Sequence, residues 1–340
     1  MTLRVYLLRR LAFVAFVLLG VSIITFTVAR VLPGDPAALY AGPTARGPAI
    51  EAARKVLNLD RPLYQQYVSY MDGLVHGDWG SSLRTKRPVL GDIVKYAPLS
   101  LELVLSATLF AAVVGTALGT LTAQKRGRGI DFVVRIFAVG GVALPAFWIA
   151  LMMQLIFSRF LHVLPAAGQS SIEVMITHPI THVTGMPLFD ALVTGNFVAF
   201  FDSLRYFILP FLALAAYPTG VVMRMTRSAL LESLGQDYIR MERAMGVSNR
   251  VILYRYALKN SLAPVLTVLG LTLAYSLIGM FFIEEVFYYP GLGSYGMTSI
   301  LSLDYPAIMG VTLFVAVIYV LTNLAVDLGI AALDPRVTLS

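Results

Sequence analysis

Few residues of this 340-residue chain have the types and spacing that a catalytic or metal site requires. His178 and His182 lie four positions apart, as two metal ligands on one helix would, but Pro179 lies between them and opposes such a helix. The chain has no cysteine, which excludes disulfides and thiolate metal sites. It also contains no GxxxxGK(S/T) loop for nucleoside triphosphates and no HExxH or GxSxG motif. The sequence therefore predicts that this chain is not an enzyme and binds no metal or cofactor itself.

Gly291, Gly293 and Gly296 match the GxGxxG pattern of dinucleotide-binding loops. A dinucleotide site needs a strand before this pattern and a helix after it. Here an apolar stretch long enough to cross a membrane precedes the glycines, and the segment is predicted to face away from the cytoplasm. We therefore interpret the match as coincidental.

Two carboxylates, Glu102 and Asp327, fall inside apolar stretches, where an ionisable side chain is first considered functional. Each lies near a predicted end of its stretch, Glu102 toward the outside and Asp327 toward the cytoplasm. This placement favours carboxylates that have partners at the membrane boundary. It does not provide the paired midplane charges expected of a carrier driven by an ion gradient.

The composition is that of a membrane protein, since 58% of the residues are hydrophobic, only 13% are charged, and the mean hydropathy is +0.76. Soluble domains carry about 25% charged residues. The net charge of +7 comes from Lys and Arg residues that are segregated along the chain, so it indicates membrane topology and not a nucleic-acid partner.

Several apolar stretches are long enough to cross the hydrocarbon core of a bilayer. Short loops with Lys or Arg alternate with loops that have none, which places both termini in the cytoplasm. The predicted fold class is therefore an all-α polytopic membrane protein with six transmembrane helices. The six stretches cover residues 11–29, 99–123, 131–157, 204–226, 262–283 and 307–332.

Two patterns inside these stretches concern packing. Gly115 and Gly119 form a GxxxG pattern, which predicts a close approach of two helices. Pro145 interrupts the third stretch, where we expect neighbouring helices to satisfy the carbonyl that the proline frees.

The segment from Arg224 to Lys259 is the long polar and basic part of the second half, with seven Lys or Arg and three acids. A basic loop between apolar spans is predicted to be cytoplasmic. Tyr238, Met241 and Met245 have helical spacing, and Gly246 is a plausible helix end. The pattern predicts a short helix at the membrane surface that offers a docking face to a soluble partner.

The order of residues in this segment resembles the cytoplasmic coupling loop of ABC-importer permeases of the peptide type. The resemblance rests on residues 237–240, 243–248 and 260–264. The general permease pattern begins Glu-Ala-Ala, and Arg240, Met241 and Glu242 stand there instead, which fits the peptide branch. Charge alone would favour a loop made basic only by topology. The resemblance implies that an ATPase subunit docks on Asp237, Tyr238, Arg240, Glu242, Arg243, Ala244, Met245 and Gly246.

Further motifs resemble the B-type subunit of dipeptide and oligopeptide importers and extend the resemblance over nearly the whole chain. They lie at residues 33–36, 77–83, 190–196, 284–293, 304–306 and 333–336. The motif at residues 284–293 also suggests an outer gate or a docking point for a binding protein. The alternative is that the two glutamates simply cap the outer end of the fifth span. The residues concerned are Glu284, Glu285, Gly291 and Gly293.

The resemblance implies a type I ABC importer permease fold in a prokaryotic cell membrane. Residues 1–31 would form the N-terminal segment and first span, residues 32–97 an extracytoplasmic loop region, and residues 98–340 the permease core with coupling loop 227–262. The implied partners are a homologous second permease that completes the pore, two ABC ATPases that bind ATP and Mg, an extracytoplasmic substrate-binding protein and the lipid bilayer.

Dipeptides and oligopeptides are the expected substrates. Nickel chelates, glutathione and oligosaccharides are alternatives, since permeases of this group import them and the binding protein sets most of the selectivity. A secondary transporter driven by an ion gradient is the rival of another class, and it would require an inverted repeat or paired midplane charges. A membrane-embedded enzyme would require a nucleophile or metal cluster within the spans. The sequence shows none of these features.

Overall fold

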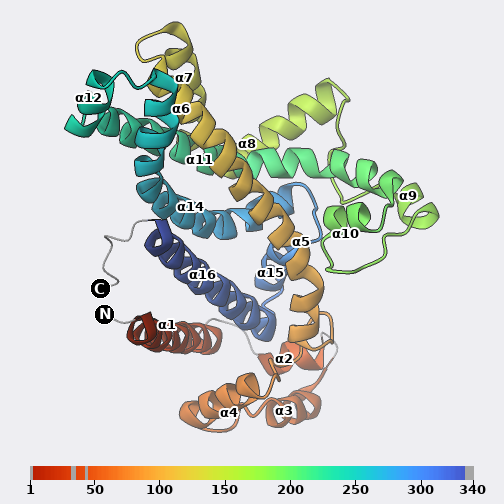
Figure 1. Ribbon diagram of the computed structural model, residues 1–340. Helices are drawn as coiled ribbons and strands as arrows, with labels where there is room; N and C mark the ends of the chain where they lie inside the picture. Colours follow the sequence, from red (N-terminus) through yellow and green to blue (C-terminus); the bar gives the residue numbers. More distant parts are fainter. Residues whose placement is uncertain (1–2, 32–35, 43–44, 334–340) are drawn as a thin grey trace.

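The structure is a computed structural model that describes residues 3–31, 36–42 and 45–333 (Figure 1). Regular structure in these residues is helical, apart from an isolated bridge between Ser81 and Pro88, so the predicted all-α class is confirmed. The motifs predicted at 33–36 and 333–336 lie largely outside the described residues.

Among the described residues, five helices are long and apolar enough to cross a membrane, and a bent pair of helices provides a sixth span if its two parts are counted together. This agrees with the six predicted spans. The five are α1 (Leu3–Val31), α5 (Val89–Phe110) continued through a π-helical segment (Ala111–Gly115) into α6 (Thr116–Gln124), α11 (Phe197–Leu234), α14 (Lys259–Val286) with the preceding residues from Asn249, and α16 (Tyr305–Leu333).

The bent pair consists of α7 (Gly129–Ala143) and α8 (Ala146–Met153), which continues as a π-helical segment (Gln154–Phe160). The helix axis bends by 111° between the two parts. Pro145 disfavours the helical conformation of Leu144, which is extended with ψ 139°, and the helix restarts after the proline. The expected interruption is therefore a complete break, whereas prolines inside α5, α11 and α14 leave those helices continuous.

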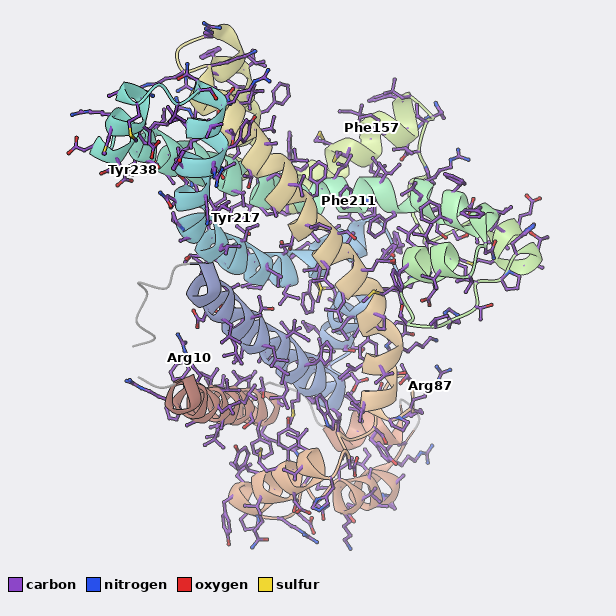
Figure 2. The ribbon with its side chains drawn as sticks, viewed as in Figure 1. Arg10, Arg87, Phe157, Phe211, Tyr217 and Tyr238 are labelled. Atoms are coloured by element: carbon purple, nitrogen blue, oxygen red, sulfur yellow. The ribbon has the colours of Figure 1, made fainter. Side chains whose placement is uncertain are left out.

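The centre of the bundle lies where α11 packs against α14, with α5, α8 and α16 around them. Phe211 of α11 packs edge-on against Phe110 of α5, with ring centres 5.2 Å apart (Figure 2). The predicted close packing at the GxxxG pattern is confirmed. A side chain at Gly115 would come within 2.9 Å of Val222, and one at Gly119 within 2.6 Å of the Met223 carbonyl.

Short helices cover the ends of these spans. The short helices between α1 and α5 form a first group. One of them, which carries Tyr67 and Tyr70, packs against the end of α1 and the start of α16, where these two residues form one cluster with Phe26 and Tyr305. In Figure 1 this group lies at the bottom, and α12 lies at the upper left beside the turn between α6 and α7. The short helices are α2 (Pro36–Ala41), α3 (Gly47–Val56), α4 (Leu63–Val75), α9 (Ile172–Thr177), α10 (Pro187–Val193), α12 (Asp237–Ala244), α13 (Asn249–Val251) and α15 (Leu292–Leu301).

Candidate functional site

The candidate site is α12, which contains the residues expected to dock an ATPase. Asp237 lies in its first turn, where a carboxylate interacts favourably with the helix dipole. The helix ends at Ala244, and Gly246, the predicted stop, follows its C-cap residue Met245 in a left-handed conformation with φ 81°. Gly246 N donates to the Arg243 carbonyl at 3.0 Å, and Val247 N donates to the Glu242 carbonyl at 3.1 Å. This pair of bonds is a Schellman motif, which fixes the direction in which the chain leaves α12.

One buried side chain fastens α12 to the bundle. Ile239 has no exposed surface and belongs to a cluster with Leu230 of α11, Ala123 of α6, and Ile252 and Ala257 of the segment that precedes α14. The helix therefore packs against the ends of three membrane helices at once. The sequence analysis did not single out Ile239, although it is an apolar residue within a polar stretch.

A pair of hydrogen bonds adds a second attachment. The Tyr238 hydroxyl lies 2.6 Å from Ser233 Oγ at the end of α11 and accepts from Asn260 Nδ2 of α14 at 3.1 Å. Tyr238, labelled in Figure 2, thus connects α12 to the two helices that form the centre of the fold. Displacing α12 would pull on both helices together.

The other side of α12 faces outward. The side chains of Met241 and Met245 are 64% and 60% exposed, and Arg243 and Ala244 are exposed as well. Arg240 forms an ion pair of 3.2 Å with Asp237, but both side chains are largely in solvent, where such a pair contributes little to stability. Glu242 is half-buried. The structure therefore brings all eight predicted residues together on one helix and its C-terminal turn, with apolar and charged groups on its open face.

An ion cluster around a buried carboxylate lies between α7 and α11. The Asp131 carboxylate is 1% exposed. Its two oxygens each accept one hydrogen bond of 3.2 Å from the Arg227 guanidinium. Arg135 is paired with it at 3.2 Å, and Gly127 N donates to it at 3.0 Å. The cluster ties α7 and the turn before it to α11. Asp131 was predicted only as the start of a span, and its ion pairs were not predicted.

At the other end of the bundle, Glu284 has no exposed surface. Its carboxylate accepts from Ser100 Oγ at 2.5 Å and from Ser294 N at 3.0 Å, while Ser100 Oγ accepts from Leu292 N at 2.7 Å. Glu284 therefore holds the first turn of α15 against α5. This burial leaves no surface of Glu284 for direct contact with a binding protein.

Two of the predicted glycines surround this carboxylate. A side chain at Gly291 would overlap the Glu284 carboxylate. One at Gly293 would come within 2.8 Å of Phe281 Cα and 2.9 Å of Glu284 Oε2, so both positions favour glycine. Glu285 is half-buried and is not part of the arrangement. The structure thus brings three of the four predicted outer residues together. Their role in a gate stays a prediction.

The two carboxylates inside apolar stretches have partners, as predicted. Glu102 accepts from Leu188 N at 3.3 Å and from Phe189 N at 2.8 Å, at the start of α10. Asp327 forms an ion pair of 2.7 Å with Arg10 of α1. Glu102 and Asp327 thus have separate partners and do not pair with each other.

Tyr289 lies near both Glu102 and Glu284 and is 2% exposed. Burial raises the pKa of its hydroxyl well above the usual value, and the two carboxylates raise it further. The hydroxyl therefore stays neutral.

The loop that contains the histidines is organised by a carboxylate. Asp190 accepts from the backbone N–H groups of Val183, Thr184 and Gly185 and from the Thr184 hydroxyl. Burial raises the pKa of Asp190, but these hydrogen bonds outweigh it and the net shift is downward. In the described part of the chain, no group of three His, Asp or Glu side chains is arranged to hold a metal.

Comparison with known proteins adds family and fold. Residues 115–339 match the family model described as binding-protein-dependent transport system inner membrane component, and residues 3–106 match the model for the N-terminal part of such components. The chain is 46% identical over 321 residues to a probable D,D-dipeptide transport system permease protein of Escherichia coli K12, covering 94% of each chain.

Other relatives carry related descriptions. A dipeptide transport system permease protein of Alkalihalophilus pseudofirmus is 40% identical, and a glutathione transport system permease protein of Escherichia coli K12 is 33% identical. Each alignment covers 98% of both chains. A solved structure of the MetNI methionine ABC transporter in inward facing conformations has the same fold, with a TM-score of 0.50, 17% identity, and coverage of 72% of this chain and 97% of that one.

Proposed function

The chain belongs to the inner membrane components of binding-protein-dependent transport systems, and from this we propose that it forms one half of the translocation pore of an ATP-driven importer of dipeptides and oligopeptides. As a permease subunit of an ABC transporter, it does not hydrolyse ATP itself. A homologous second permease would complete the pore, two ABC ATPases would bind ATP and Mg on the cytoplasmic side, and an extracytoplasmic binding protein would deliver the peptide.

The observation that carries this proposal is the double attachment of α12. Ile239 is buried against the ends of α6 and α11, and Tyr238 reaches both Ser233 and Asn260. A force on the open face of α12 therefore acts on α11 and α14, the two helices at the centre of the fold. Coupling requires that the ATPase bind α12 differently in its two states, because a contact of equal strength in both shifts no equilibrium.

The open face of α12 has the chemistry for such a contact. Met241 and Met245 offer flexible apolar surface that adapts to a groove, while Arg240 and Arg243 offer charge that selects the partner. Gly246 and its two backbone bonds keep the helix end rigid. Arg240, Arg243 and Met245 are thus assigned to the interface, and Tyr238 is assigned to transmission.

Peptides are favoured as substrates because relatives described as dipeptide permeases are 46% and 40% identical to this chain, whereas the glutathione permease relative is 33% identical. Glutathione is itself a small peptide and is the second candidate. We propose that the binding protein makes most of the choice between them.

The test is the ATPase activity of the complete transporter, reconstituted in liposomes with its binding protein, in the presence of dialanine or glutathione. We expect dialanine to stimulate hydrolysis and glutathione to have no effect. Stimulation by glutathione alone would keep the transporter class and replace the substrate. Hydrolysis that responds to neither, together with no uptake of labelled dialanine, would contradict the peptide proposal.

A further inference from the structure

A cavity of about 250 Å³ lies where α1 ends, between α4, the loop after it and the first turn of α16. Its wall includes Arg30 at the end of α1, Gln66 and Tyr70 on α4, and Tyr305 on α16. The proposed coupling function uses none of these residues. Since each water molecule takes about 30 Å³ of liquid, the cavity has room for a small polar group.

Four polar atoms of this wall are buried and have no hydrogen-bond partner in the part of the chain that the structure describes. They are Arg30 Nε, Gln66 Oε1 and the hydroxyl oxygens of Tyr70 and Tyr305. The described residues contain nine such side-chain atoms, so almost half of them surround one cavity. Buried polar atoms nearly always have a partner. Four such atoms around one cavity leave its wall with unused hydrogen-bonding capacity.

The chemistry of these atoms indicates an oxygen-rich anion. Arg30 is permanently charged and can only donate, and the two hydroxyls can donate as well. The Phe26 ring lies 5.3 Å from the Arg30 guanidinium carbon, and Arg30 Nε has no hydrogen-bond acceptor among the described residues. Burial, with a smaller effect of Tyr67, raises the pKa of Tyr70 to about 12, so this hydroxyl remains a neutral donor.

A second charged group limits the charge of the ligand. Asp78 also lines the cavity, and its Oδ1 accepts from Gly80 N at 3.0 Å. Asp78 is exposed, so solvent screens its charge from the half-buried Arg30, but it still opposes an anion that carries two charges. Gln66 Oε1 is an acceptor and suits an N–H or O–H group on the same ligand, since Gln66 Nε2 is already bonded to the Arg61 carbonyl at 2.8 Å.

We propose that this cavity binds a singly charged oxyanion, with Arg30 as its cationic partner and the hydroxyls of Tyr70 and Tyr305 as further donors. Two sources offer this chemistry. Arg30 closes the apolar stretch Arg9–Arg30, so it lies at the membrane boundary, where the phosphodiester of a phospholipid is found. The carboxylate of a small solute is the other source. The four atoms are covered in the structure, so binding turns their side chains toward the ligand.

The experiment uses the purified transporter complex with the full chain. Native mass spectrometry measures retention of phosphatidylglycerol, and thermal unfolding compares sodium acetate with sodium chloride at equal ionic strength. The variants are Arg30→Gln and Tyr70→Phe. Arg87→Gln is the matched control, because Arg87 is exposed in the same region and does not line the cavity (Figure 2).

We expect Arg30→Gln to weaken binding about tenfold or more and Tyr70→Phe about threefold, since a hydrogen bond to a charged group contributes more than a neutral one. Arg87→Gln should bind like the wild type. Loss of one tightly held phosphatidylglycerol identifies the lipid as the source, and loss of the acetate effect identifies a free carboxylate.

Equal binding of both probes to wild type and Arg30→Gln would overturn the proposal, as would no binding of either probe to wild type, which would leave water as the occupant. If Arg30→Gln does not reach the membrane, Tyr70→Phe decides the question, because it keeps the ring and removes only the donor. Dialanine-stimulated ATPase is measured on the same samples, so failure of this site is distinguished from failure of the transport proposal.

Discussion

The Asp304 carboxylate accepts a hydrogen bond of 2.5 Å from the Ser82 hydroxyl, although the two residues are 222 positions apart. It also accepts from Leu83 N at 3.0 Å and Arg84 N at 3.1 Å. Asp304 is completely buried at the start of α16. One carboxylate thus closes the polar loop after α4 onto the last membrane helix, and it joins two motifs that look like separate turns in the sequence.

Asp304→Ala should therefore loosen this loop. Removing the carboxylate leaves the Ser82 hydroxyl and two backbone N–H groups without their acceptor, at a cost of about 2 kcal/mol or more. Trypsin cleavage after Arg84 and Lys86, which are both exposed, followed by mass spectrometry, should become several times faster. Asp72→Ala is the control, since the Asp72 side chain is 76% exposed. Equal cleavage rates in both variants would show that Asp304 does not hold the loop.

Gly246→Val should abolish transport while the chain remains in the membrane. No atom lies within 4 Å of a side chain placed there, so the effect arises from the left-handed backbone at φ 81°, which costs a β-branched residue about 1–2 kcal/mol or more. Gly246→Asn should keep most of the uptake of labelled dialanine, because asparagine adopts this conformation readily. If the two variants transport equally well, the rigid end of α12 is not required.

Reversing the charge on the open face should separate the permease from its ATPase. We expect the double variant Arg240→Glu with Arg243→Glu to lose uptake and to co-purify with much less ATPase. The control is Arg250→Glu with Arg255→Glu, the same charge change at exposed positions outside α12. Wild-type uptake in the first double variant would reject α12 as the docking site.

Tyr238→Phe tests transmission separately from docking. The ring remains, but the hydroxyl bonds to Ser233 and Asn260 are lost, which weakens the attachment by about 1–2 kcal/mol. ATPase binding should persist while the number of peptides transported per ATP falls. Tyr254→Phe, at an exposed tyrosine of the same loop, should behave like the wild type. An unchanged ratio in Tyr238→Phe would argue against this connection.

Asp131→Asn should destabilise the junction of α7 and α11. It leaves Arg227 and Arg135 without their common carboxylate, so the contact between the two helices is weakened. Thermal unfolding of the purified complex should shift downward by several degrees. Asp237→Asn removes a carboxylate that is 95% exposed and should leave the unfolding temperature unchanged. A shift of equal size in both would contradict the structural role of Asp131.

The membrane spans were predictable because apolar runs reflect the lipid around them, but their ends were not. The stretch predicted at residues 204–226 is the apolar part of α11, which runs from Phe197 to Leu234. The Asn196 side chain caps its start by accepting from Ala199 N at 3.2 Å. Hydropathy reports where a helix meets lipid, whereas the helix itself ends where its backbone finds caps.

The candidate site was predictable in place and only partly in detail. The spacing of Tyr238, Met241 and Met245 predicted a helix, yet the buried residue is Ile239 and the two methionines are exposed. The face that a short surface helix buries depends on contacts with distant helices, which a local pattern does not contain. For the same reason the partners of Asp131 and Asp304 were not predicted.

The first helix, which also packs against α16, makes two polar side-chain contacts with other elements and is largely exposed between them. Arg10 is paired with Asp327 near one end, and near the other Ser22 Oγ lies 2.9 Å from the Tyr67 hydroxyl. Inserting one residue between these points would turn one contact by about 100° relative to the other and move it by about 1.5 Å, so both could not form. Both contacts can therefore form only at the present spacing along α1. For these contacts, the number of residues between Arg10 and Ser22 matters more than which apolar residues they are.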